Sequence, residues 1–241
     1  LGRHWEIPWL AAAFTSMTVA LSSPWWAASG VLYHDSVAVT LILLGLVIWQ
    51  CRSTDNGLGA SFCALAAGFL LAFAVVTTYL VLPIVLLICV YLIVSRPSSR
   101  AMVCFTLGFL PTLSILPISN AIVFGSPFAT GYSAGGFDQN FPSPLNLSNA
   151  WEKMGFYLWQ PEYGLLWSFP VFFLGAIGLT LSAPLKPRVR HMLMLLAAVH
   201  FLFIVTMEHH GSVGWGMGRF FLPLYPILAL GLPAFFHLAG W

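Results

Sequence analysis

The chain has 241 residues, of which 59% are hydrophobic and only 7% are charged, with a net charge of +2 and a mean hydropathy of +0.90. So few charges cannot coat a soluble globule of this length, and the same composition excludes a disordered chain and a nucleic-acid binder. The apolar runs are continuous rather than alternating, which excludes a transmembrane barrel and leaves an all-α, polytopic membrane protein.

Eight apolar runs approach the length of about 20 residues that a membrane-spanning helix needs. They predict about eight spans within a single transmembrane domain over residues 1–241. The runs cover residues 8–23, 34–50, 60–77, 78–94, 101–123, 168–183, 190–207 and 220–240. Thr77, Thr78 and Pro83 indicate a turn or kink between the third and fourth runs, so we expect two tilted spans there.

The basic residues of the short loops set the predicted orientation. With eight spans they all fall on one side, which we assign to the cytoplasm of a bacterial inner membrane. They are Arg3, Arg52, Arg96, Arg100, Lys186, Arg188 and Arg190. The segments near 24–34, 124–167 and 208–219 then face outward, and they hold most of the side chains capable of chemistry.

Three tryptophans mark the longest of these outer segments. Trp151, Trp159 and Trp167 suit an amphipathic interfacial helix around 148–160, and they suit equally an aromatic belt that anchors the chain at the membrane surface. His200 lies inside a predicted span, where we expect it to pack or to form a hydrogen bond between helices.

Asp35 stands where the second apolar run begins, with His34 beside it. A carboxylate at a helix N-terminus is favoured by the helix dipole, so it has an ordinary structural explanation. It is also a candidate catalytic or cation-binding group, because acids at the edge of a membrane bundle are often functional. His34 could share a proton or contact a phosphate.

A glycine-rich segment from Glu208 to Arg219 precedes the last run. Its four glycines leave backbone N–H groups accessible to a phosphate. Arg219 stands at the start of the last predicted helix, where we expect its charge to have an anionic partner. A pair with Glu208 or an interfacial anchoring role is the alternative. The neighbouring Glu208, His209 and His210 lack the spacing of a metal site, so we predict no bound metal there.

Four segments, in this order along the chain, resemble the polytopic glycosyltransferases of the GT-C superfamily, in the dolichyl-phosphate-mannose and aminoarabinose-transferase-like branch. The segments are Ser23–Ala27 with Leu32–Asp35, Asn120–Pro127 with Thr130–Tyr132, Tyr163–Pro170, and Gly214–Phe220 with Pro223 and Pro226. The resemblance covers nearly the whole chain, although none of the four motifs is specific by itself.

The resemblance implies an enzyme that takes a sugar from a polyprenyl phosphate on the outer face and transfers it with inversion. An outer-loop Asp acts as general base, and basic residues, in some members with a divalent cation, hold the lipid phosphate. Asp35 with His34 would then be catalytic. The candidate substrate-binding or phosphate-binding residues are Arg219, His210, Gly216, Gly218 and Tyr132.

The family's main catalytic Asp lies in the first outer loop, and no run before residue 8 supplies that loop. We therefore expect either the core of a longer enzyme or a reduced relative that serves as a non-catalytic structural subunit of a membrane complex. The expected partners are membrane lipids, a polyprenyl-phosphate sugar and other membrane subunits. A lipid transporter is a third possibility, but charges within the spans are nearly absent.

Overall fold

The computed structural model describes residues 34–51, 57–95, 97–129, 150–160, 164–168, 170–181, 187–206, 221, 223–233 and 235. These residues form helices and turns, and no strand occurs among them. Three of their helices are long and apolar enough to cross a membrane: Leu58–Thr77, Ser99–Phe124 and Pro187–Thr206. The all-α membrane protein predicted from the composition is confirmed at this level, whereas the count of eight spans stays a prediction.

The chain divides into two compact units. One comprises Val37–Pro144 and is called here the α4–α6 unit; the other comprises Leu1–Ser36 with Leu145–Trp241 and is called the α11 unit. Helix α3 (His34–Gln50) has its first three residues in the α11 unit and the rest in the α4–α6 unit. The single domain expected over 1–241 stays a prediction.

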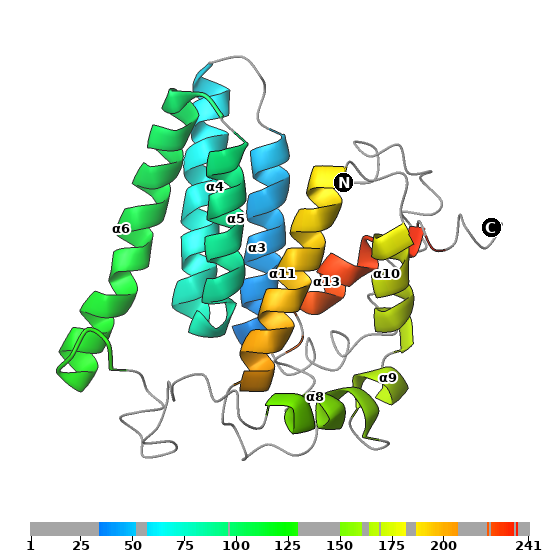
Figure 1. Ribbon diagram of the computed structural model, residues 1–241. Coiled ribbons are helices and arrows are strands. Elements are labelled where there is room, and N and C mark those ends of the chain that lie inside the picture. The colour runs from blue at the N-terminus through cyan, green and yellow to red at the C-terminus, as the bar shows by residue number, and fades with distance from the viewer. Residues whose placement is uncertain are drawn as a thin grey trace. The chain divides into compact units, whose positions relative to one another are not determined.

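The helices of the α4–α6 unit follow the predicted apolar runs closely. After α3 come α4 (Leu58–Thr77), the short 3₁₀ helix η2 (Tyr79–Val81), α5 (Leu82–Val94) and α6 (Ser99–Phe124). The runs 34–50, 60–77, 78–94 and 101–123 are thus confirmed as helical. Figure 1 shows α3, α4 and α5 standing side by side, with α6 leaning away from them toward its C-terminal end.

The turn predicted between α4 and α5 is present and has a local cause. Thr78 is extended at φ −152° and ends α4, while the Thr77 hydroxyl donates to the Phe73 carbonyl at 2.8 Å. Pro83 then lies in the first turn of α5, where its missing N–H costs nothing. The chain therefore reverses between two apolar helices without a polar loop.

Helix α6 begins and ends at capping residues. The Ser98 hydroxyl accepts a hydrogen bond from the Ala101 N–H at 3.3 Å, and Gly125 ends the helix in the left-handed conformation at φ +75°. Pro111 and Pro117 lie inside the helix. Such prolines are tolerated in membrane helices, where neighbouring groups compensate for the lost backbone bond.

Helices α4 and α6 touch through glycine. A Cβ atom placed on Gly68 would fall on the Phe105 carbonyl of α6, and one placed on Gly108 would fall on the Leu65 carbonyl of α4. The two backbones are therefore in direct contact in both directions. In α6, the Phe105 ring packs edge-on against Trp49 of α3, with centroids 5.5 Å apart. Close backbone approach at small residues is how helices associate in lipid.

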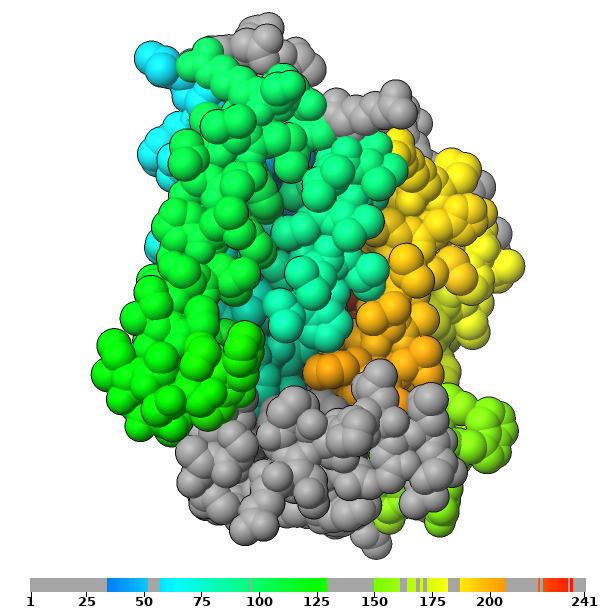
Figure 2. All heavy atoms as spheres, turned by 60° about the vertical axis from the view of Figure 1, so that its left-hand side comes forward, coloured from blue at the N-terminus to red at the C-terminus, as the bar shows by residue number. Residues whose placement is uncertain are grey.

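The second half of α6 presents apolar side chains outward. No residue from Leu113 to Phe124 is buried, and Ile118, Ile122 and Val123 are all more than half exposed. Figure 2 shows the whole length of α6 as an open surface. A soluble monomer does not carry an apolar patch of this extent, so lipid or another membrane helix must cover it.

The α11 unit holds the shorter and more irregular helices. They are α8 (Ala150–Trp159), α9 (Leu165–Ser168), α10 (Pro170–Leu181), α11 (Pro187–Thr206) and α13 (Leu224–Ala229). The helix predicted around 148–160 and the run 190–207 are confirmed as helical. Within the run 168–183, α10 covers Pro170–Leu181, and the run 8–23 lies outside the described residues.

The last run, 220–240, is not one continuous helix. Helix α13 covers only Leu224–Ala229, and Leu230 and Gly231 form a turn after it. The turn lies at a second glycine contact, because a Cβ on Gly178 of α10 would fall on the Gly231 carbonyl, and a Cβ on Gly231 would fall on the Gly175 carbonyl. The glycine that breaks the helix is therefore the one that lets its backbone meet α10.

One buried ring connects α8 to α11. Phe221 is 1% exposed, and its ring lies edge-on to Tyr157 of α8 at 5.6 Å and tilted against Phe201 of α11 at 5.7 Å. Figure 1 shows α8 lying crosswise at the C-terminal end of α11. Phe221 fills the corner between them.

We predict that Gly68→Ala destabilises the protein by about 1–3 kcal/mol, because the new methyl must push α6 away from α4. Gly59→Ala is the matched control, since it lies in the same helix with nothing within 4 Å of the added Cβ. Thermal unfolding of both variants in detergent, followed by intrinsic fluorescence, measures the difference. Equal melting temperatures for the two variants would contradict the glycine contact.

We predict that Phe221→Ala costs about 3–5 kcal/mol, the usual cost of emptying a buried aromatic site. Phe128→Ala is the control, because Phe128 is 87% exposed. The same unfolding measurement serves here. A melting temperature for Phe221→Ala as high as that of Phe128→Ala would show that the corner does not depend on this ring.

Candidate functional site

The described part of the candidate site is the pair His34 and Asp35 at the start of α3. The Nε2 atom of His34 lies 3.4 Å from Oδ1 of Asp35. The Asp35 side chain is only 4% exposed, whereas that of His34 is 47% exposed. The carboxylate is thus withdrawn from solvent and the imidazole connects it to the surface. Such a pair can accept a proton at the buried oxygen and pass it outward.

The position of Asp35 in its helix explains part of this geometry. It lies in the first turn of α3, where the free N–H groups and the dipole favour a negative charge. An exposed carboxylate would interact with the helix dipole in the same way, so the dipole does not explain why Asp35 is buried. Burial of a charged group costs free energy that its partners must offset, and helix capping does not require this burial.

The other predicted site residues lie outside the described part of the chain. They are Arg219, His210, Gly216, Gly218 and Tyr132. The first described residue after the glycine-rich segment is Phe221, two residues after Arg219. Because Phe221 is held between Tyr157 and Phe201, the chain just after the glycine-rich segment is fixed to α8 and α11.

The motif Asn120–Pro127 has a clear local structure. Gly125 in its middle ends α6, and the Asn120 side-chain amide donates to the Pro127 carbonyl at 3.5 Å. Glycine is required there because only it adopts φ +75° without strain. The Asn, Gly and Pro of this motif therefore build the C-terminal end of α6.

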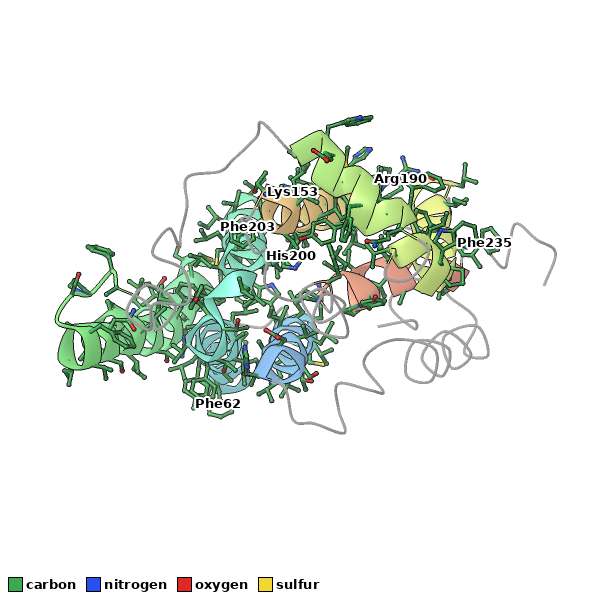
Figure 3. All side chains as sticks on the ribbon, turned by 90° about the horizontal axis from the view of Figure 1, so that it is seen from below. Phe62, Lys153, Arg190, His200, Phe203 and Phe235 are labelled. Carbon is green, nitrogen blue, oxygen red and sulfur yellow. The ribbon has the colours of Figure 1, made fainter. Side chains whose placement is uncertain are left out.

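Two polar groups, one on α8 and one just after it, were not singled out by the sequence analysis. The Nζ atom of Lys153 and the Oε1 atom of Gln160 are buried and have no hydrogen-bond partner among the residues that the structure describes. Figure 3 shows Lys153 over the end of α11 that carries Phe203. Burial of an ammonium group without a partner costs free energy, and an anion bound beside it would reduce this cost by accepting its hydrogen bonds. The only sequence signal was a lone lysine in an aromatic helix.

The surroundings of α8 are otherwise apolar. Burial raises the pKa of the Tyr157 phenol above its ordinary value, so this side chain stays neutral. His200 is fully buried in α11, inside an apolar helix as predicted. Within the described ranges, no three His, Cys, Asp or Glu side chains gather where they could hold a metal ion.

No protein-family model, no curated protein and no solved structure matches the chain.

Proposed function

We propose that this chain is an integral membrane glycosyltransferase of the GT-C type, with about eight spans in a bacterial inner membrane. It transfers a sugar from a polyprenyl phosphate on the outer face. The observation that carries the proposal is the buried Asp35 carboxylate at the start of α3, with His34 3.4 Å away. The order of the resembling motifs along the chain supports it.

The proposed chemistry needs one base and one phosphate contact. The acceptor oxygen or nitrogen forms a bond to the anomeric carbon, while the bond from that carbon to the phosphate oxygen breaks. Asp35 takes the acceptor's proton, and His34 relays it to solvent. The electron pair of the broken bond leaves on the polyprenyl phosphate, which Arg219 holds, and in relatives a divalent cation assists.

The positions of the basic residues along the helices support the proposal that Asp35 and the α8 region lie on the outer face of the membrane. Arg188 and Arg190 lie in the first turn of α11, and the positive-inside rule places that end in the cytoplasm. The C-terminal end of α11, where α8 packs, is then the outer end. Asp35 begins α3, and Arg52 follows its end, so Asp35 also belongs to the outer side.

A second candidate function is a non-catalytic structural subunit of a larger membrane complex. The unburied apolar half of α6, Leu113–Phe124, favours it, because another subunit's helix could cover that surface. A chain with this role needs neither a base nor a carrier lipid. An assay of sugar transfer therefore distinguishes the two candidate functions.

We predict that Asp35→Asn lowers transfer about a hundredfold or more, because the amide cannot accept the acceptor's proton. The full chain is reconstituted with a panel of polyprenyl-phosphate sugars, and release of free polyprenyl phosphate is measured. Asp55→Asn removes the same charge from a loop predicted to be cytoplasmic and serves as control. Unchanged release by Asp35→Asn would remove Asp35 from the site, and a wild-type chain inactive with every donor would favour the structural subunit.

We predict that Arg219→Ala weakens binding of polyprenyl phosphate by about 2–5 kcal/mol, because a desolvated phosphate loses its charged partner. Titration with polyprenyl phosphate and with the uncharged polyprenol measures the contribution of the phosphate. Arg188→Ala, in the first turn of α11, removes the same charge at the end predicted to be cytoplasmic and is the control. Lys153→Gln tests the second cation in the same way. If Arg219→Ala binds both lipids as wild type does, Arg219 has an anchoring role instead.

A further inference from the structure

The side of α8 that faces away from the rest of the α11 unit is aromatic. Trp151 is 80% exposed and Trp159 is 61% exposed, and Phe156 lies on the same side of the helix. Glu152 is the single charged residue there. The opposite side carries Tyr157, which packs on Phe221. The outward side of an ordinary surface helix would instead be mostly charged.

This aromatic side is extended and held by α9. The indole N–H of Trp167 donates to the backbone carbonyl of Trp159 at 3.0 Å, which satisfies a carbonyl at the C-terminal end of α8. The Trp167 ring remains 61% exposed. Gly164 makes the tight turn possible, because a Cβ there would lie 2.7 Å from the Gln160 nitrogen. The three tryptophans are thus part of one hydrogen-bonded corner, called here the tryptophan corner (residues 150–160 and 164–168).

The tryptophan corner lies at a defined level along a membrane-spanning helix. It packs on the end of α11 that is farthest from Arg188 and Arg190, and α8 lies across the axis of α11 (Figure 1). Helix α11 also has outward apolar side chains, with Leu195 and Leu202 about half exposed. The exposed rings therefore stand where the apolar surface of the span ends.

We propose that the tryptophan corner lies in the headgroup region of the lipid bilayer and contacts phospholipid directly. An indole ring has an apolar body and one N–H donor, and this combination suits the boundary between acyl chains and water. The near absence of charge on this side argues against a purely aqueous position, and its continuity with the apolar surface of α11 favours lipid over a protein partner. The proposal does not depend on sugar transfer.

Spin labels test this position in the full chain. Trp151→Cys and Trp159→Cys are made separately in a chain whose four native cysteines are replaced by serine, labelled with a nitroxide, and reconstituted in phosphatidylcholine–phosphatidylglycerol nanodiscs. Accessibility to oxygen and to a water-soluble nickel chelate gives the depth of each label. Lys153→Cys on the inner side is the shielded control, and Ser53→Cys is the aqueous control.

Lipid contact predicts a higher ratio of oxygen to nickel accessibility at both tryptophan positions than at position 53. A ratio equal to that of position 53 would place the corner in water, and shielding from both reagents, as at position 153, would indicate a protein partner. Either result would overturn the proposal. If a labelled variant does not fold, quenching of intrinsic fluorescence by headgroup-labelled lipid replaces it, and Trp151→Phe with Trp159→Phe must then reduce the quenched fraction.

Discussion

Direct contact between helix backbones at glycine is the constraint on which each unit of this protein depends. Lipid is as apolar as leucine, so burial of leucine gives little reason for one membrane helix to prefer another. Close packing of backbone atoms does give such a reason, because the dispersion contacts require an exact match of surfaces. Gly68 and Gly108 supply this match in the α4–α6 unit, and Gly175, Gly178 and Gly231 supply it in the α11 unit.

The positions of the longer helices could be predicted from the sequence because their cause is local. An unbroken apolar run must form a helix in lipid to satisfy its own N–H and C=O groups. The turn at Thr77 and Thr78 could likewise be predicted, because Pro83 follows these two β-branched residues at a distance of five positions from Thr78. The pairing of Gly68 with Phe105, in contrast, depends on the register between two helices. The glycines of each helix do not reveal which residue of the other helix they meet.

The candidate site likewise has parts that could be predicted from the sequence and parts that could not. Asp35 and His34 are adjacent in the chain, so their proximity followed directly from the sequence, whereas the burial of the carboxylate did not. Phe221 was missed because a phenylalanine in an apolar run carries no signal of its own. Its only distinction in sequence is its place just after the glycine-rich segment. Lys153 was missed because burial of its Nζ atom depends on how α8 rests on α11.

The Phe221 corner has a mechanical consequence. A single ring touches both the crosswise helix α8 and the spanning helix α11, and it lies two residues after Arg219. A span whose apolar length differs from the thickness of the bilayer tilts, kinks or deforms the surrounding lipid, at a cost of a fraction of a kcal/mol per Å of mismatch. If α8 lies in the headgroup region, as proposed above, a change in the tilt of α11 acts directly on the contacts of Phe221 with Tyr157 and Phe201. The thickness of the surrounding membrane would then be a variable that acts on the packing of α8 against α11.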